Sequence, residues 1–328
     1  MLSVRGVHKK FEGERSKWAL KGINFSSKPG NHIFVIGETG SGKSTLLKCI
    51  FGIYDLDKGN IKWNGERILG PSEQLIAGNP NMRLVEQEYK LSTFKTLEAN
   101  LLESLPLGLY KKEQKERISE MLSLFELEGM GNKKPFELSG GQQQRAAIAK
   151  AFINLPSVLL LDEPFAHFDP QMRNKVFEFL HERIEKEHLL VITVTHDFYE
   201  TLKNADLVMV VEKGKIIQSG ASQELYGKPI NLYVAGLLGE YNEVVVGQNK
   251  YFVRPEELAI LDKGKYKAEI VNIRFCGHFI EITLLYKGVE IKSFAHLKFA
   301  HKIGDKVLFD FPLKSPTILP TGEIVPWN

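Results

Sequence analysis

A glycine-rich stretch near the N-terminus, GETGSGKST, contains residue types that can bind phosphate groups. Gly37, Gly40 and Gly42 let the backbone turn its N–H groups towards phosphate oxygens, and a helix starting near Lys43 adds the positive end of its dipole. The Lys43 ammonium can reach the β- and γ-phosphates of a nucleotide, and the Ser44 hydroxyl can bind Mg²⁺. A surface turn before a helix is the alternative. The apolar run HIFVI before the loop and GKST at its end favour phosphate binding.

Two carboxylates stand at the end of a second apolar run, VLLLDEP, residues 158–164. Asp162 is placed to hold Mg²⁺ through water, and Glu163 to polarise an attacking water molecule. Taken alone, a strand that ends in two solvated acids explains the pattern equally well. Together with the glycine-rich loop, the pattern favours nucleotide hydrolysis.

A third motif, LSGGQQQR at residues 138–145, precedes a face of small residues in AAIAKAF. Ser139, Gly140 and Gly141 at the start of a helix would form another anion site, because free N–H groups and the helix dipole point the same way. By itself, SGG is an ordinary N-cap and turn.

Composition limits the classes of protein to consider. The chain has 328 residues, enough for about two domains of roughly 100–200 residues each. The net charge of +3 is too small for a nucleic-acid footprint, so no nucleic-acid partner is expected. Two distant cysteines fit a reducing cytoplasm, and no run is long or apolar enough for a signal peptide or a spanning helix. A membrane role would therefore come through a partner.

The elements that must position these motifs form two regions. HIFVI, SVLLLDEP, LLVITVTHD and DLVMVVEKGKII have the continuous apolar character of a parallel sheet covered on both faces, and STLLKCIFGI has helical spacing. Thr96–Leu105 and Lys111–Leu127 are predicted as amphipathic helices. Short, partly alternating segments from YFVRPEELAIL onward predict a small all-β barrel or sandwich. The predicted domains are 1–236, with a helical insert at about 88–150, and 241–328.

The motifs occur in the order GETGSGKST, LSGGQQQR, VLLLDEP and VTHD. They resemble the Walker A, signature and Walker B motifs and the switch histidine of ATP-binding-cassette (ABC) ATPases. The resemblance covers roughly residues 1–235 and implies an α/β P-loop NTPase cassette with a helical subdomain. It implies Mg²⁺ contacts at Ser44, Gln87 and Asp162. It also implies ATP contacts at Phe11, Gly37, Glu38, Gly40, Ser41, Gly42, Lys43, Ser44, Thr45, Ser139, Gly140, Gly141, Gln142 and Asp169.

The remaining roles come from the same resemblance. Glu163 resembles the catalytic glutamate, Gln87 in LVEQEY resembles the Q-loop glutamine, and His196 resembles the histidine that contacts the γ-phosphate. Asp169 in FAHFDP resembles the D-loop aspartate that links two sites across a dimer. The sequence departs from the family at Glu86, where a hydrophobic residue often stands, and at Phe168, where leucine is usual.

Two pairs of residues, an aromatic pair and a cysteine–histidine pair, have competing interpretations. Phe11 in HKKFEG resembles the aromatic residue that stacks on adenine, with Trp18 as its rival, and either residue can equally belong to the core. Cys276 and His278 in RFCGH are two potential metal ligands, but a zinc site needs about four, which favours a cysteine at a strand end. Cys49 is expected as a buried thiol on the helix after the loop.

FVRPEELAIL and the β-rich tail resemble the OB-like regulatory (TOBE) domain of ABC importer ATPases, and a generic small β domain is the alternative. The resemblance implies an ATP-sandwiched homodimer at the inner face of the cell membrane. Its partners would be transmembrane permease subunits and, indirectly, an extracytoplasmic solute-binding protein. Polyamines, ferric iron or oxyanions are the expected cargo, and the short tail favours the polyamine or iron type. The alternatives are an ABC ATPase acting on ribosomes or DNA, and an exporter ATPase.

Overall fold

The computed structural model describes residues 1–11, 18–86, 91–165, 168–312, 316–319 and 321–325. These residues divide into two compact units, Met1–Ser222 and Gln223–Asn328, which are described separately. The predicted α/β architecture with a small all-β C-terminal region is confirmed. No helix in the described ranges is long and apolar enough to cross a membrane.

The first unit is built on a six-stranded sheet with the order β10-β9-β3-β8-β7-β6. Neighbouring strands from β9 to β6 run parallel, and β10 pairs with β9 in the antiparallel sense. The run DLVMVVEKGKII, predicted as part of the parallel sheet, is therefore a hairpin, because Lys213 and Gly214 take positive φ angles of 48° and 82° and reverse the chain. The strands are β3 (His32–Ile36), β6 (Met82–Val85), β7 (Val158–Asp162), β8 (Leu190–Val194), β9 (Leu207–Glu212) and β10 (Lys215–Gly220).

This sheet is buried on both faces, which explains its continuous apolar runs. Along β3, Ile33 and Val35 join one core cluster, while Phe34 between them joins the other. The alternation repeats in β7, where Leu160 faces the first cluster and Leu159 the second. Because both faces of each strand are packed, the position of the strand end is restrained, and so is the start of the loop that follows it.

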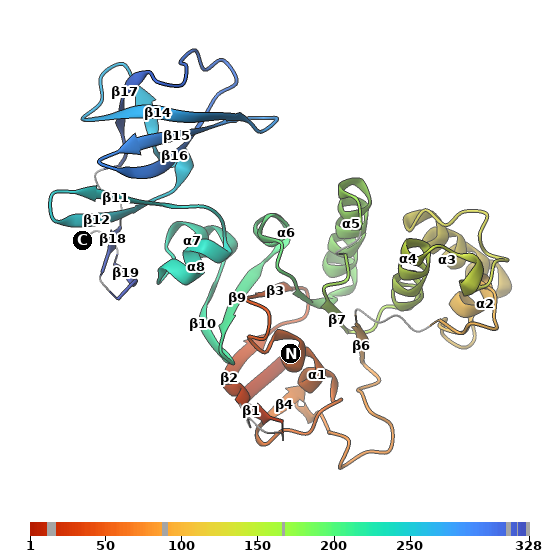
Figure 1. Ribbon diagram of the computed structural model, residues 1–328. Helices are drawn as coiled ribbons and strands as arrows, with labels where there is room; N and C mark the ends of the chain where they lie inside the picture. Colours follow the sequence, from red (N-terminus) through yellow and green to blue (C-terminus); the bar gives the residue numbers. More distant parts are fainter. Residues whose placement is uncertain (12–17, 87–90, 166–167, 313–315, 320, 326–328) are drawn as a thin grey trace. The chain divides into compact units, whose positions relative to one another are not determined.

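One face is covered by α1 (Lys43–Phe51) and a four-stranded antiparallel sheet with the order β2-β1-β4-β5. Leu46, Leu47 and Ile50 of α1 are fully buried in this cluster. Figure 1 shows α1 beside these strands near the N-terminus. The strands are β1 (Leu2–Lys10), β2 (Trp18–Ser27), β4 (Lys58–Trp63) and β5 (Glu66–Arg67).

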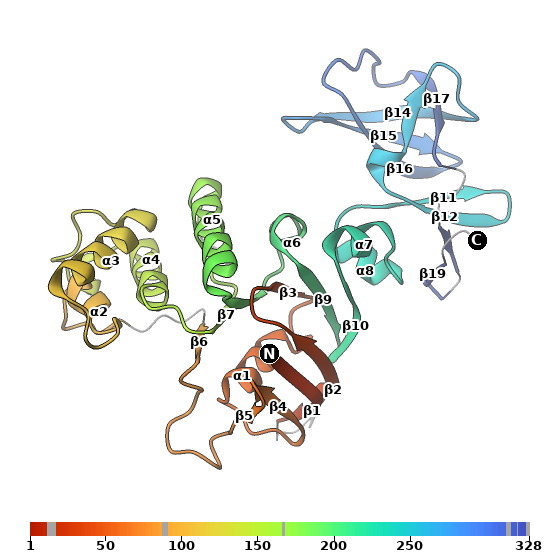
Figure 2. The ribbon, with the colours of Figure 1, turned by 180° about the vertical axis from the view of Figure 1, so that it is seen from behind.

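Helices cover the other face, and α2, α3 and α4 form one group in both views (Figure 1, Figure 2). The predicted helices at 96–105 and 111–127 are present but shorter. The first begins after Thr96, whose side chain accepts a hydrogen bond from the backbone N–H of Ala99 and caps the helix. The helical elements are α2 (Leu97–Leu102), α3 (Lys111–Leu124), η1 (Pro135–Glu137), α4 (Gly140–Phe152), α5 (Pro170–Glu187) and α6 (Phe198–Asn204).

The second unit consists of a five-stranded sheet, β13-β17-β14-β15-β16, and a four-stranded sheet, β11-β12-β18-β19. Apolar residues of both sheets share one core. The elements are α7 (Ser222–Gly227), α8 (Leu232–Leu237), β11 (Asn242–Val246), β12 (Asn249–Val253), η2 (Pro255–Glu257), β13 (Ala259–Leu261), β14 (Tyr266–Phe275), β15 (Ile280–Tyr286), β16 (Val289–Ala295), β17 (Lys306–Asp310), β18 (Thr317–Ile318) and β19 (Ile324–Val325).

Within the second unit, Arg254 joins residues 226–240 to the β strands that follow them. Its side chain is almost fully buried between the rings of Tyr226 and Phe252, and burial lowers its pKa. The guanidinium donates hydrogen bonds of 2.8–3.4 Å to four backbone carbonyls, those of Tyr226, Ala235, Gly239 and Glu240. These bonds explain why the compact unit starts at Gln223, whereas the sequence places the domain boundary at 236–241.

Candidate nucleotide site

The loop between β3 and α1 holds its glycines in conformations that other residues rarely adopt. Gly37, Gly40 and Gly42 have φ angles of 151°, 80° and 109°. A Cβ at Gly37 would lie 2.1 Å from the carbonyl oxygen of Val211, and one at Gly42 would lie 2.4 Å from that of Ala19. At Gly40 a Cβ would meet nothing within 4 Å, so this part of the loop faces open space.

Lys43 and Ser44, the first residues of α1, point their polar atoms at this loop and at β7. Lys43 is buried, and its ammonium donates to the carbonyl oxygens of Gly37 at 2.7 Å and Glu38 at 2.9 Å. The Ser44 hydroxyl donates to Oδ1 of Asp162 at 3.0 Å. The loop and the acidic end of β7, 118 positions apart in the sequence, therefore lie side by side.

Two further loop residues take part in this geometry. The backbone N–H of Ser41 donates to the Glu38 carbonyl at 3.1 Å, which closes the loop. The Ser41 hydroxyl is buried and has no hydrogen-bond partner in the described part of the chain. Thr45 follows on α1 and is half-buried.

Glu163 and His196 lie together at the ends of neighbouring strands β7 and β8. Nδ1 of His196 is 3.4 Å from Oε2 of Glu163, and the Glu163 backbone N–H donates to the Val194 carbonyl at 3.0 Å. Glu163 has a positive φ of 48°, an uncommon conformation for this residue type that points to a constrained turn. Both side chains stay partly exposed, so a ligand at this edge can reach them.

Burial acts on the charges at this edge in opposite senses. Desolvation lowers the pKa of Lys43, although Glu163 and Asp162 counteract it. Desolvation raises the pKa of Asp162, opposed by the hydrogen bond from Ser44 and by the nearby lysines. Each charge is thus only partly compensated within the chain, which favours binding of a phosphate to Lys43 and of a cation to Asp162.

The SGG motif begins helix α4, with Ser139 as its N-cap. The Ser139 hydroxyl accepts a hydrogen bond from the Gln142 backbone N–H at 3.3 Å, and the Gln142 side chain accepts one from the Ser139 backbone N–H at 3.0 Å. Gly140 and Gly141 have open space where a Cβ would stand. The motif is an ordinary capping box in this chain, with an open surface in front of the helix start.

Comparisons with known proteins identify relatives of this chain. A family model described as "ABC transporter" matches residues 20–166. The sulfate/thiosulfate import ATP-binding protein CysA of Synechocystis sp. is 39% identical over 289 residues, covering 81% of this chain and 80% of that protein. CysA of Pseudomonas putida is 34% identical over 296 residues, covering 88% of each.

This chain belongs to the ABC transporter ATP-binding proteins. Proteins of this family hydrolyse ATP to power transport, so the chain is an ATPase. Two solved structures of the dimeric cassette MJ0796, one of them in a post-hydrolysis state with ADP and phosphate, are 28% identical to this chain. They match with TM-scores of 0.60 and 0.59 over 68% of this chain and 99% of the cassette.

The glycine-rich loop between β3 and α1 and its neighbours fit the two groups that the family implies, ATP and Mg²⁺. The open face at Gly40, the buried Ser41 hydroxyl without a partner in the described residues and the Lys43 ammonium suit phosphate oxygens. A serine hydroxyl and a carboxylate, Ser44 and Asp162, are the oxygen ligands that Mg²⁺ takes beside a phosphate.

The two departures from the ABC pattern have structural explanations. Glu86 forms an ion pair of 2.8 Å with Lys48 of α1, which gives this polar residue a partner at a position where the family often has a hydrophobic one. Phe168 is buried, with its ring centroid 5.4 Å from that of Phe165 and 6.3 Å from that of Phe125. Gln87, the predicted Q-loop residue, lies outside the described residues.

The predicted D-loop and adenine-stacking residues lie at the surface. Asp169 caps α5 by accepting hydrogen bonds of 3.0 Å from the backbone N–H groups of Gln171 and Met172. Phe11 is 42% exposed and packs edge-on against Tyr54 at 5.1 Å, while Trp18 is 37% exposed and packs edge-on against His8. Each aromatic ring has exposed surface on which an adenine base could stack, and the choice of Phe11 stays a prediction.

Three residues to which the sequence assigns no role, Arg173, Asp197 and Glu200, lie next to this site. Arg173 on α5 donates to the carboxylates of Asp197 and Glu200 at 3.0 Å and 2.8 Å. The spacing of an aspartate and a glutamate at the start of α6 signals a helix N-terminus, but no local pattern points to an arginine on another helix.

Proposed function

We propose that this chain is the ATP-hydrolysing subunit of an ABC importer that drives solute uptake. One observation carries the proposal. Lys43, Ser44 and Asp162 come together at the edge of the sheet, with Glu163 following Asp162 directly. The relatives named above as import proteins support the direction of transport.

The proposed chemistry divides the site into binding and reacting groups. The loop N–H groups and Lys43 bind the β- and γ-phosphates, and His196 contacts the γ-phosphate. Ser44, Asp162 and Gln87 would hold Mg²⁺, which neutralises charge on the phosphates when bound. Glu163 accepts a proton from the attacking water, and the water oxygen then bonds to the γ-phosphorus as the bond to ADP breaks.

We propose that two copies of the chain form a homodimer around two ATP molecules. Ser139 and the start of α4 offer an anion site without a metal-binding partner of their own, so the γ-phosphate bound to the loop of one copy would meet this site on the other. Asp169 would reach across the same interface. The dimeric state of the solved cassettes supports this arrangement.

We propose a separate role for each of the two predicted domains. Residues 1–236 would be the ATPase, with residues near Gln87 and the helical segment 88–150 docking on two permease subunits. Residues 241–328 would be a TOBE-like regulatory domain. The chain would lie at the cytoplasmic face of the membrane, and an extracytoplasmic solute-binding protein would deliver cargo to the permease.

For the cargo we propose an oxyanion of the sulfate type, because both relatives above are named for sulfate and thiosulfate. The short C-terminal region instead favours polyamines or ferric iron, which remains the second candidate. Uptake of labelled sulfate, putrescine and ferric iron is measured in cells with and without the chain. The solute whose uptake is lost without the chain is the cargo. Loss of polyamine or iron uptake alone would reject the oxyanion.

The importer role is tested by capturing partners of the tagged Glu163→Gln variant from detergent-solubilised native membranes with ATP and Mg²⁺. We expect a polytopic permease, with Lys43→Ala as the control that should lose it because ATP binding is weakened. Recovery of ribosomal or DNA-repair proteins without a permease would contradict transport. A permease with no solute-binding protein encoded beside it would favour an exporter.

A further inference from the structure

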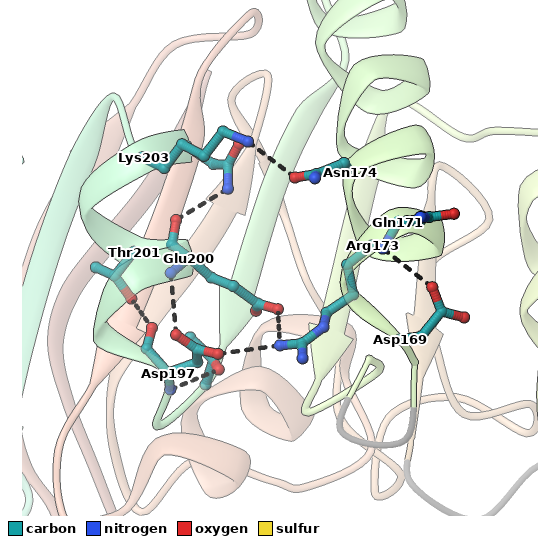
Figure 3. A network of polar contacts seen from close by, with 10 residues as sticks. Asp169, Gln171, Arg173, Asn174, Asp197, Glu200, Thr201 and Lys203 are labelled. Carbon is teal, nitrogen blue, oxygen red and sulfur yellow. Dashed lines mark hydrogen bonds and ion pairs between the residues drawn. The ribbon is translucent and has the colours of Figure 1, made fainter. Parts of the chain in front are cut away.

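Arg173 lies between Asp169 of the proposed D-loop and Asp197 at the start of α6 (Figure 3). It stands in the first turn of α5, four residues after Asp169, and its side chain extends towards the start of α6. A cavity of about 210 Å³ is lined by Arg173 together with Glu163, His196 and Glu200. The arginine therefore faces the same space as the two proposed catalytic side chains.

One nitrogen of Arg173 holds both carboxylates at the start of α6. Nη1 donates to Oδ2 of Asp197 at 3.0 Å and to Oε1 of Glu200 at 2.8 Å. All three side chains are at most one-third exposed, which makes these ion pairs stronger than pairs in open solvent. Asp197 directly follows His196, so this contact restrains the residue next to the proposed γ-phosphate contact.

The turn that carries His196 has further bonds within its own segment. The Asp197 backbone N–H donates to the Thr195 hydroxyl at 3.0 Å, and Oδ1 of Asp197 accepts from the Glu200 backbone N–H at 3.0 Å. These bonds shape the turn locally. In the described residues, the polar contact that ties Asp197 to α5 comes from Arg173.

The other end of the link is the α5 N-terminus. The Arg173 backbone N–H donates to the Asp169 carbonyl at 3.0 Å, and the Asp169 side chain caps the same turn. A movement of Asp169 would therefore move the backbone of Arg173, and through its side chain the turn that bears His196. This is a short, continuous mechanical connection between two loops that both face the nucleotide in the proposed dimer.

We propose that Arg173 is a positioning residue that couples the D-loop to the switch histidine. It holds His196 next to Glu163, and it transmits the position of Asp169, set by the opposite subunit, to the reacting site of its own subunit. This inference rests on the proposed ATP-bound dimer. It assigns Arg173 no contact with ATP itself.

Arg183, on the same helix, provides a matched control. Its side chain is 28% exposed against 27% for Arg173. It also binds two carboxylates, Glu120 at 3.0 Å and Glu187 at 2.6 Å, and in the described residues the Nε atoms of both arginines are buried without a hydrogen-bond partner. Arg183 lines a separate cavity that contains none of the proposed site residues.

The test compares ATP hydrolysis by full-length wild type, Arg173→Met and Arg183→Met over a range of ATP concentrations. We expect kcat of Arg173→Met to fall about 10- to 100-fold, because small displacements of catalytic groups have effects of this size. KM should change less than about two-fold, since no ATP contact is removed. The Hill coefficient should approach one, because the link between sites is lost. Arg183→Met should keep the wild-type kcat and Hill coefficient.

A second pair of variants separates positioning from stability. Arg173→Lys keeps a cation and should retain kcat within a few-fold of wild type. Arg173→Met alone leaves the half-buried Glu200 carboxylate without its charge partner. Arg173→Met/Glu200→Gln removes this unpaired charge as well, so its melting temperature should recover while kcat stays low. Recovery of kcat together with melting temperature would show a structural role only.

The outcomes distinguish the inference from the function on which it rests. Wild-type chain without ATP hydrolysis would overturn the proposed function. Two outcomes with an active wild type would overturn the role of Arg173 alone. One is an equal loss of kcat in Arg173→Met and Arg183→Met. The other is a changed KM with unchanged kcat in Arg173→Met.

Discussion

Replacing Arg254 with methionine should destabilise the second unit more than any change to an exposed charge there. Methionine retains most of the apolar stem between Tyr226 and Phe252, so the main loss is the guanidinium with its bonds to four backbone carbonyls. The prediction therefore measures the hydrogen bonds rather than the loss of packing.

The magnitude follows from the burial of the four acceptors. The bonds to the carbonyls of Ala235 and Gly239 are buried, whereas those to Glu240 and Tyr226 are partly exposed and can be replaced by water. Two orphaned buried acceptors cost about 1–3 kcal/mol each. Removing a desolvated cation from the interior returns part of this cost. The expected net loss is about 2–4 kcal/mol.

Hydrogen exchange followed by mass spectrometry on the full-length chain can measure this loss for each unit. The slowest amides of β12 and β14 should exchange about 30- to 900-fold faster in Arg254→Met, while those of β3 and β8 should not change. Arg274→Met is the control, because its side chain is 66% exposed and its ion pair with Glu281 is 3.8 Å long; we expect a change within about 0.5 kcal/mol. Equal effects of both substitutions would refute the reasoning.

Three further substitutions or modifications test the site and its surroundings. Lys43→Ala should weaken ATP binding by at least about 10-fold, because the cation that faces the loop is lost; unchanged affinity in calorimetry would contradict the phosphate loop. Phe11→Ala should weaken ATP binding about 10-fold through lost stacking while Trp18→Ala should not, and the reverse result would assign the stacking residue to Trp18. Iodoacetamide at pH 8 should modify exposed Cys276 and spare Cys49, because burial raises the pKa of the Cys49 thiol to about 12 and the thiolate is the reactive form; peptide mass spectrometry showing rapid modification of native Cys49 would contradict this burial.

The elements that could be predicted from the sequence are those with a local pattern. The strand, loop and helix around Lys43 follow one another in the chain, and glycine at 37 and 42 is required by close backbone contacts within this unit. The pairing of Ser44 with Asp162 could also be predicted, because carboxyl ends of parallel strands meet at one edge of a sheet.

The features that escaped prediction depend on contacts between distant segments or on a single turn. The sequence predicts the β9–β10 hairpin as part of the parallel sheet, because the turn at Lys213 and Gly214 interrupts an apolar run only briefly. Arg173 gave no signal, since its partners lie on another helix. The buried role of Arg254 has no local signal beyond the VRPE motif, because its carbonyl acceptors lie 14–28 residues away.

The central claim is that ATP is hydrolysed at this edge of the sheet with Glu163 as the general base. The steady-state ATPase activity of Glu163→Gln tests this claim most directly. Light scattering on the same variant, with and without ATP, measures its molar mass. The account predicts a loss of turnover of about 10²–10⁴-fold together with a stable ATP-bound homodimer that Lys43→Ala does not form. Wild-type turnover in Glu163→Gln would contradict the role of Glu163 and the mechanism built on it.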